Sequence, residues 1–188
     1  MALTTLDPVT ALVVIDLQKG LVGMACAHPI ADVVARARAL ADAFRARDLP
    51  VVLVNVTGGA PGRTEAPRRD MAALPADFAE LVPELGQRPG DICVTKRTWG
   101  AFAGTDLAAQ LRALGVTQVV VVGVATGTGV ESTARQAYEL GFNVTLAIDA
   151  MTDTRAAAHD YSLAHVFPRL GEIGRTEDII ALLERRTA

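Results

Sequence analysis

The chain has 188 residues, of which 51% are hydrophobic and 4% aromatic, and its formal net charge at pH 7 is −3. This length and apolar content fit one globular domain over residues 1–188 and exclude a disordered chain. The negative charge argues against a nucleic-acid-binding protein, because a phosphate-binding face normally needs a surplus of basic residues.

The first ten residues, MALTTLDPVT, lack the basic residues and the long apolar run of a signal peptide. Apolar runs such as residues 119–122 are far too short to span a bilayer. We therefore predict a cytoplasmic protein with no membrane partner, whose two cysteines, Cys26 and Cys93, are reduced thiols.

The first half of the chain begins with a strand and a helix. Residues 11–17, ALVVIDL, form an apolar run that predicts a strand buried on both faces. Apolar residues recur at helical spacing over residues 30–48, so an amphipathic helix is expected there. A second strand follows at 51–56. Residues 57–69 have the composition of a long surface loop, which in a compact domain is usually functional.

A short helix is expected at residues 77–81, followed by a turn-rich segment. From there strands alternate with helices. Strands are predicted at residues 91–95, 119–122 and 143–148, with a short sixth strand at 171–174. Helices are predicted at residues 105–114, 128–140, 155–167 and 176–185. Thr105 with Asp106 would cap the first of these helices, and Thr176 would cap the last.

This alternation predicts an α/β fold of three layers, a Rossmann-like parallel sheet with helices on both faces. Six strands suggest the order 3-2-1-4-5-6, which places a ligand crevice where the first and fourth strands part. Asp16 ends the first strand, Lys96 follows the third, and the glycine-rich turn 123–129 follows the fourth. We expect these three features to meet at one edge of the sheet.

An acid, a base and a turn that presents backbone N–H groups can form an acid–base site. In a partly buried crevice Lys96 would favour the carboxylate of Asp16, whereas desolvation would favour the protonated acid. The larger effect decides whether Asp16 is a general base or a general acid, and the sequence leaves both open. An aspartate at the end of a strand can also be a helix cap or half of a structural ion pair.

Three segments resemble the motifs of the isochorismatase-like hydrolases, a family that includes the cysteine hydrolases and the nicotinamidases. They are VVIDLQKG around Asp16, VTKRTWGAFAGTDL around Lys96, and GVATGTGVESTARQAYELGF around Gly129. The later segments AIDAMTD and GRTEDI also fit, so the resemblance spans nearly the whole chain. It implies a hydrolase without a cofactor, in which Asp16 and Lys96 are the catalytic pair.

Gly129 departs from most of that family. In its amidases the matching residue is a cysteine that attacks the carbonyl, with the aspartate deprotonating it and the lysine supporting the pair. Glycine has no side chain, so a covalent thioester at this position is excluded. The isochorismatases proper carry Asp, Lys and Gly in these three places. There the protonated Asp is thought to protonate the vinyl-ether carbon of isochorismate, after which water attacks and pyruvate leaves.

The amino-acid sequence of the turn is more similar to that of the cysteine hydrolases. The isochorismatases typically have an aromatic residue and a histidine where this chain has Ala-Thr-Gly-Thr at residues 125–128. By resemblance, the peptide bond between Val124 and Ala125 is cis. The resemblance also implies that the N–H groups of Ala125 and Gly129 face the substrate as an oxyanion-binding pair.

Neither cysteine is a strong candidate to replace the missing thiol, since free cysteines are usually small buried hydrophobic residues. Cys26 lies in the loop after the first strand, near the predicted crevice. Cys93 lies in the third strand, where the alternation of ICV predicts core packing.

No metal is expected. The family's nicotinamidases hold zinc with an Asp-x-His cluster after the second strand, and residues 54–57, VNVT, contain no such cluster. His159 and His165 are six residues apart and are expected to be surface or packing histidines rather than ligands. His28 precedes a proline and is expected to cap its loop.

Several residues are candidates for contact with a substrate. Arg63, in the long loop, could bind a carboxylate in bidentate fashion or be a solvated loop arginine. Trp99 and Phe102 either wall the pocket or pack in the core or at a subunit interface. Gln18 lines the crevice or stabilises its own loop, and Thr128, like Ala125, would contact the substrate from the turn.

These features together predict a hydrolase that adds water across an activated bond by acid–base chemistry, with vinyl-ether hydrolysis as the model. Asp16 is the proton donor or acceptor and Lys96 its electrostatic partner. Two alternatives remain open: a degenerate cysteine hydrolase that binds a small ligand without turnover, and a hydrolase that opens an amide or another strained electrophile with Asp-activated water. A small-molecule substrate is expected, as is a homodimer or homotetramer, which is common in the family.

Overall fold

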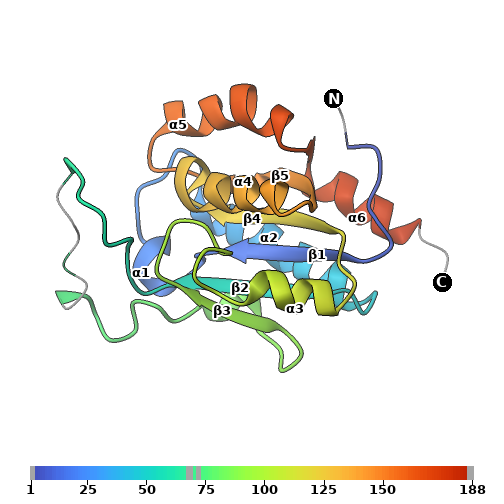
Figure 1. Ribbon diagram of the computed structural model, residues 1–188, viewed down its shortest axis with the longest axis horizontal. Helices are drawn as coiled ribbons and strands as arrows, with labels where there is room; N and C mark the ends of the chain where they lie inside the picture. The colour runs from blue at the N-terminus through green and yellow to red at the C-terminus, as the bar shows by residue number, and fades with distance from the viewer. Residues whose placement is uncertain (1–2, 67–69, 71–72, 186–188) are drawn as a thin grey trace.

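The computed structural model describes residues 3–66, 70 and 73–185. Six parallel strands form one sheet in the order β3-β2-β1-β4-β5-β6, which confirms the predicted fold class (Figure 1). The strands are β1 Thr10–Ile15, β2 Val51–Val56, β3 Ile92–Lys96, β4 Gln118–Val124, β5 Asn143–Thr152 and β6 Glu172–Gly174.

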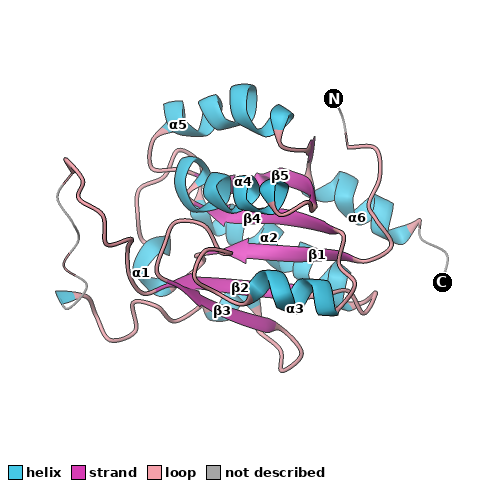
Figure 2. Cartoon of the chain, viewed as in Figure 1, coloured by secondary structure: helices cyan, strands magenta, loops and turns pink. Residues whose placement is uncertain are grey.

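Helices cover both faces of the sheet. In Figure 2, α2 and α6 lie behind it, and α3 and α4 lie in front. The α-helices are α1 Lys19–Val22, α2 Ile30–Arg45, α3 Leu107–Ala113, α4 Glu131–Glu139, α5 Ala156–Tyr161 and α6 Thr176–Glu184. Single turns of other helix types are η2 Pro83–Leu85, η3 Thr126–Val130, η4 Ser162–Val166 and η5 Phe167–Arg169.

The central strands are buried because both of their faces are covered. Every residue of β1 and of β4 is buried. Alternate residues of β1 belong to two hydrophobic clusters: Val13 packs with α3 and α4, and Leu12 and Val14 pack with α2 and α6. Continuous apolar runs of this kind are typical of parallel strands, and they explain why these strands were predictable.

The segment 77–81 is not the helix that the sequence predicts. Residues 76–79 form a turn, and Leu81 makes an antiparallel bridge to Gln18. The carbonyls of Phe78 and Glu80 accept hydrogen bonds from the backbone N–H groups of α1, at Gly20 and Lys19. These carbonyls therefore bond to a distant segment, where an isolated helix would have used them internally.

Two further expectations are wrong. Thr176 is the first residue inside α6 rather than its cap; Arg175 occupies the cap position, and its N–H donates to the Asp178 carboxylate. The N–H and hydroxyl of Thr176 both donate to Asp149 instead. Cys93 is exposed rather than packed in the core, because β3 is an edge strand whose alternate residues face outward.

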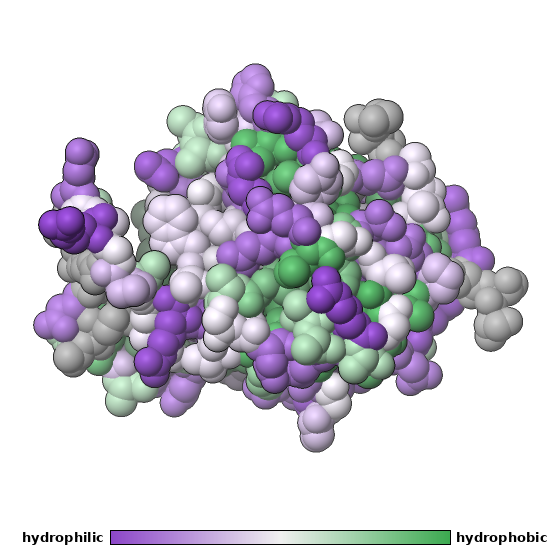
Figure 3. All heavy atoms as spheres, viewed as in Figure 1, coloured by the Kyte–Doolittle hydropathy of each residue, from purple (hydrophilic) through white to green (hydrophobic). Residues whose placement is uncertain are grey.

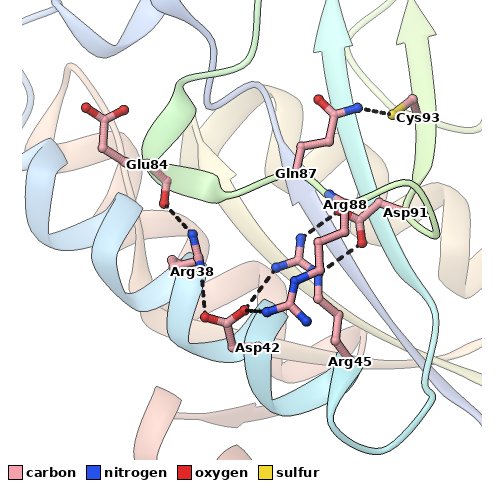
Figure 4. Close-up of polar contacts among 8 residues, drawn as sticks. All are labelled: Arg38, Asp42, Arg45, Glu84, Gln87, Arg88, Asp91 and Cys93. Carbon is pink, nitrogen blue, oxygen red and sulfur yellow. Dashed lines mark hydrogen bonds and ion pairs between the residues drawn. The ribbon is translucent and has the colours of Figure 1, made fainter.

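A cluster of charged residues ties α2 to the segment before β3 (Figure 4). The guanidinium of Arg45 donates to both carboxylate oxygens of Asp91, at 3.0 and 2.6 Å, and the two side chains are 8% and 3% exposed. Asp42 accepts from three arginines, Arg38, Arg45 and Arg88. Because the Arg45–Asp91 pair is buried and bidentate, removing one partner would leave an uncompensated buried charge, so this is the pair of the cluster whose disruption is most costly.

Over the part of the chain that the structure describes, no helix is both long and apolar enough to cross a membrane. Figure 3 shows polar residues over most of one face, with an apolar area at the surface between α3 and α4. The carboxyl ends of the strands lie at the edge of the sheet beside α1, where the arrow of β1 ends (Figure 1). Asp16, Lys96 and the turn after β4 lie at this edge.

Candidate active site

Asp16 follows the last residue of β1 and is 5% exposed. Its N–H donates to the carbonyl of Val54 at 2.9 Å, which extends the pairing with β2 by one residue. Its φ angle is +54°, in the left-handed region that aspartate and asparagine tolerate better than most residues. The chain therefore turns away from the sheet at the residue that carries the carboxylate.

Gly123 brings β4 against the end of β1. Its φ angle is +113°, and a Cβ atom at this position would lie 2.1 Å from the carbonyl oxygen of Ile15. Only glycine fits this approach. The turn that follows β4 is therefore held next to Asp16.

Lys96, the last residue of β3, is 2% exposed and reaches the same place. Its Nζ lies 2.7 Å from Oδ2 of Asp16 and also donates to the carbonyl of Thr98 at 3.1 Å. The structure thus brings together two ionisable residues separated by 80 positions in the sequence. A charge-assisted hydrogen bond in such a buried position is a strong interaction.

The carboxyl of Asp16 carries a perturbed pKa. Burial raises it from 3.8 to about 6, and the charge and hydrogen bond of Lys96 act in the opposite direction without cancelling that rise. Oδ2 faces Lys96, whereas Oδ1 is buried with no hydrogen-bond partner among the described residues. Because Oδ2 accepts from Lys96, the proton of the neutral acid belongs on Oδ1. Asp16 is therefore a carboxyl group that can hold and release a proton near neutral pH.

The turn after β4 supplies the third component. The peptide bond between Val124 and Ala125 is cis, as the resemblance implies. The carbonyl of Ala125 accepts from the N–H groups of Thr128 and Val130, which closes the turn η3. A Cβ atom at Gly129 would lie 3.2 Å from Oδ2 of Asp16. Gly129 therefore faces the Asp16–Lys96 pair across a very short distance.

The outer side of this turn is held by two side chains that the sequence did not single out for this purpose. His159 was expected at the surface or in packing; it is 4% exposed, and its Nδ1 lies 2.8 Å from the hydroxyl oxygen of Thr126. The Asp153 carboxylate accepts from the N–H of Gly127 at 2.8 Å. Asp153 directly follows β5, so the rule that identified Asp16 at the end of β1 applies to it as well.

Three of the residues predicted to contact a substrate differ in their burial and in what they pack against. Gln18 is fully buried, and its amide makes three hydrogen bonds to the backbone at Val56 and Phe78, so it stabilises its loop. The ring of Phe102 stacks on Phe142 in the core, 5.8 Å between centroids. Trp99 is 65% exposed.

Arg63 lies in the exposed part of the loop after β2, and residues 67–69 of that loop are outside the described part of the chain. Cys26 is half-buried in the loop before α2. Burial and the charge of Asp153 raise the pKa of its thiol, which is the opposite of what activates a nucleophilic cysteine. The exposed Cys93 lies on the far side of β3 from Lys96.

Among residues 3–66, 70 and 73–185, no group of three or more His, Cys, Asp or Glu side chains is arranged to hold a metal ion. A hollow of about 730 Å³ lies beside Pro50 and Ile92, at the opposite ends of β2 and β3, and contains none of the site residues. The chemistry of Asp16, Lys96 and the turn therefore locates the candidate site, and the size of a cavity does not.

Residues 10–178 match the family model described as Isochorismatase domain. The isochorismatase family protein YwoC of Bacillus subtilis is 44% identical over 177 residues, which cover 91% of this chain and 92% of YwoC. The solved structure of an isochorismatase family protein from Burkholderia thailandensis superimposes with a TM-score of 0.91 at 42% identity, covering 96% of this chain and 98% of that one. The N-carbamoylsarcosine amidase of Thermoplasma acidophilum gives a TM-score of 0.74 at 27% identity, with 90% and 97% covered.

Proposed function

The chain belongs to the isochorismatase family and is a hydrolase, and we propose that it hydrolyses a vinyl ether by acid–base chemistry, with Asp16 as the proton donor. The model reaction is the conversion of isochorismate to pyruvate and a dihydroxy product. No thioester intermediate is involved.

The observation that carries this proposal is the state of the Asp16 carboxyl. Its pKa is raised to about 6, and Oδ1, the oxygen that would hold the proton, is free of protein partners among the described residues. A general acid needs its proton at the working pH, and because Oδ1 makes no hydrogen bond to the described protein residues, no such bond has to break when the proton leaves. A carboxylate with an ordinary pKa would be almost fully ionised at pH 7.

In the proposed reaction Asp16 gives up one proton and takes one back. Oδ1 of Asp16 donates its proton to the terminal CH₂ carbon of the vinyl ether, which becomes a methyl group and leaves an oxocarbenium centre. Water attacks that centre and returns a proton to Asp16. The C–O bond of the resulting hemiketal then breaks while its hydroxyl proton passes to the ether oxygen, which gives the ketone and the free alcohol. One water is consumed, and Asp16 ends the cycle protonated.

Lys96 and the turn would support these steps. The ammonium of Lys96, 2.7 Å from Oδ2, stabilises the carboxylate that forms when Asp16 gives up its proton. The N–H groups of Ala125 and Gly129 hold an anionic oxygen of the substrate. Gly129 contributes no side chain, so the turn backbone approaches Asp16 directly; a Cβ atom there would lie 3.2 Å from Oδ2.

Release of pyruvate from isochorismate tests the proposal. Asp16→Asn is the key variant, because asparagine also tolerates the left-handed backbone at this position. We expect it to abolish turnover, whereas Cys26→Ala and Cys93→Ala retain it. Full activity in Asp16→Asn, or loss of activity in Cys26→Ala, would contradict the proposal.

A second candidate, amide hydrolysis by water that Asp16 activates as a base, is favoured by the similarity to N-carbamoylsarcosine amidase. This reaction needs the ionised carboxylate, so its rate would rise with pH through about 6, opposite to the vinyl-ether reaction. Ammonia release from a panel of carbamoyl amides separates the two. If the chain turns over neither class and Gly129→Cys gains amidase activity, it is a degenerate cysteine hydrolase that binds without turnover.

A further inference from the structure

The turn that faces Asp16 is anchored from behind by a pair of imidazoles. Thr126, the second residue of the turn, is completely buried, and its hydroxyl oxygen lies 2.8 Å from Nδ1 of His159 on α5. The ring of His159 lies against that of His28, with 4.7 Å between the centroids and an angle of 58° between the planes. A continuous path of contacts therefore connects the turn to the loop between α1 and α2.

His28 is at the exposed end of this path. Its backbone N–H donates to the hydroxyl of Thr152 at 3.1 Å, and its Nδ1 lies 3.3 Å from the same oxygen. The next backbone contact, from the N–H of Ala27 to the carbonyl of Asp153, ties the same loop to the end of β5. Asp153 also accepts from the N–H of Gly127, so the loop and the turn share an anchor.

We propose that His159 is a positioning residue, which holds the turn from Ala125 to Gly129 in its working geometry through Thr126, and that His28, whose ring lies against that of His159, modulates this hold. Neither histidine touches the reacting atoms. The link to catalysis rests on the function proposed above, in which this turn presents N–H groups to the substrate.

The proposed coupling depends on the direction of the Thr126–His159 hydrogen bond, which the protonation of the imidazole sets. When His159 is neutral with its proton on Nε2, Nδ1 accepts from the Thr126 hydroxyl. When the ring is protonated, Nδ1 carries a hydrogen and must donate, so the hydroxyl hydrogen of Thr126 needs a new acceptor. Within the described residues the Thr126 hydroxyl has no other hydrogen-bond partner, and an unsatisfied buried group is unfavourable. Protonation therefore weakens the anchor.

The surroundings of His159 favour its neutral form, because they lower its pKa. Burial lowers the pKa of His159, and the neighbouring His28 lowers it further, while the carboxylates of Asp160 and Asp153 act in the opposite direction. Both imidazoles line a hollow of about 330 Å³. The other charged groups that face this hollow are Asp32 and Arg36 of α2, Asp149 of β5, and Arg175. Arg36 and Arg175 both pair with Asp149 there.

The test is a pH titration of ¹⁵N-labelled protein by NMR, which follows the ring of His159 and the amide of Gly127 together. In the wild type we expect the Gly127 amide to shift with the same midpoint as His159, below about 6.5. His159→Asn keeps an acceptor near the position of Nδ1 but does not titrate, so the shift of Gly127 should disappear. His28→Gln should move the midpoint to higher pH, because the electrostatic effect by which His28 lowers the pKa of His159 is removed. Repeating the titration in Asp16→Asn excludes a contribution from that carboxyl.

Kinetics provide an independent arm. Thr126→Val removes the hydroxyl at almost constant volume. We expect KM to rise about tenfold with kcat within roughly twofold, because the N–H groups of the turn hold an anionic oxygen that the substrate carries before the reaction as well as during it. Thr126→Ser should restore most of the loss in kcat/KM. If Thr126→Val does not fold, the same comparison is made between His159→Phe, which removes the hydrogen bond to Thr126, and His159→Asn, which keeps an acceptor for it.

The two arms distinguish this proposal from the function on which it rests. If the enzyme does not hydrolyse vinyl ethers but the Gly127 amide still shifts with the midpoint of His159, the proposed reaction is wrong and the positioning role of His159 stands. A Gly127 amide that does not respond to His159, or an unchanged KM in Thr126→Val of an active enzyme, overturns the positioning role.

Discussion

The pH dependence of vinyl-ether hydrolysis follows directly from the environment of Asp16. With the pKa of this carboxyl at about 6, about half of the free enzyme holds the proton at pH 6 and about one hundredth at pH 8. Because only the protonated form can donate, kcat/KM should fall about fiftyfold between these two pH values. The slope should approach one logarithmic unit per pH unit above pH 7.

The assay is pyruvate release from isochorismate, measured in quenched samples at low substrate concentration, so that the rate reports kcat/KM of the free enzyme. Cys26→Ala is the matched control and should show the same decline. Removing the ammonium in Lys96→Gln should move the decline to higher pH, because the charge of Lys96 lowers the pKa of Asp16. A profile that is flat or rises from pH 6 to pH 8 would refute the assignment of Asp16 as the acid.

Three further predictions concern stability and the turn. The stability that the protonated Asp16 contributes is fully present below pH 3.8 and is lost as the pH rises through about 6. Chemical denaturation should therefore show the free energy of unfolding of the wild type falling by roughly 3 kcal/mol relative to that of Asp16→Asn over this window. If the difference between the two proteins does not change with pH, the pKa of Asp16 is not raised. Gly129→Cys should fold, but its free energy of unfolding should be about 1–2 kcal/mol lower, because the added Cβ requires neighbouring atoms to move by a few tenths of an ångström. The new thiol should react with iodoacetamide. The larger side chain of Gly129→Val should prevent stable folding. Asp91→Asn should lower the free energy of unfolding by about 3 kcal/mol, because the buried Arg45 guanidinium loses its charged partner. Lys19→Gln, which removes exposed ion pairs, should leave Tm unchanged. Equal effects of the two substitutions would contradict the argument from burial.

The sheet and the meeting of Asp16 with Lys96 were predictable because both depend on simple patterns. Continuous apolar runs mark strands covered on both faces, and the carboxyl ends of parallel strands share one edge of the sheet. Asp16, which follows β1, and Lys96, which ends β3, therefore lie at the same edge of the sheet. The raised pKa of Asp16 was not predictable, since desolvation and the charge of Lys96 oppose each other.

The errors lie where tertiary contacts override local pattern. The alternation around Cys93 predicts a buried residue, but β3 is an edge strand and leaves that face uncovered. Segment 77–81 has the composition of a helix, but its carbonyls bond to α1. His159 is a packing histidine, one of the two places expected for it, but its hydrogen bond to Thr126 joins α5 to the turn, a contact that no spacing along the chain reveals. The cytoplasmic location and the homodimer or homotetramer stay predictions, and sedimentation velocity would measure the latter.

The central claim is that Asp16 holds a proton near neutral pH and gives it to the substrate. The most direct measurement is the ¹³C chemical shift of the Asp16 carboxyl, followed by NMR from pH 3 to pH 8 and assigned by its absence in Asp16→Asn. We predict a midpoint of about 6 that coincides with the midpoint of the kcat/KM profile. A carboxyl that titrates at or below its ordinary value of 3.8 would contradict the claim, because Asp16 would then be ionised at every pH at which the enzyme works.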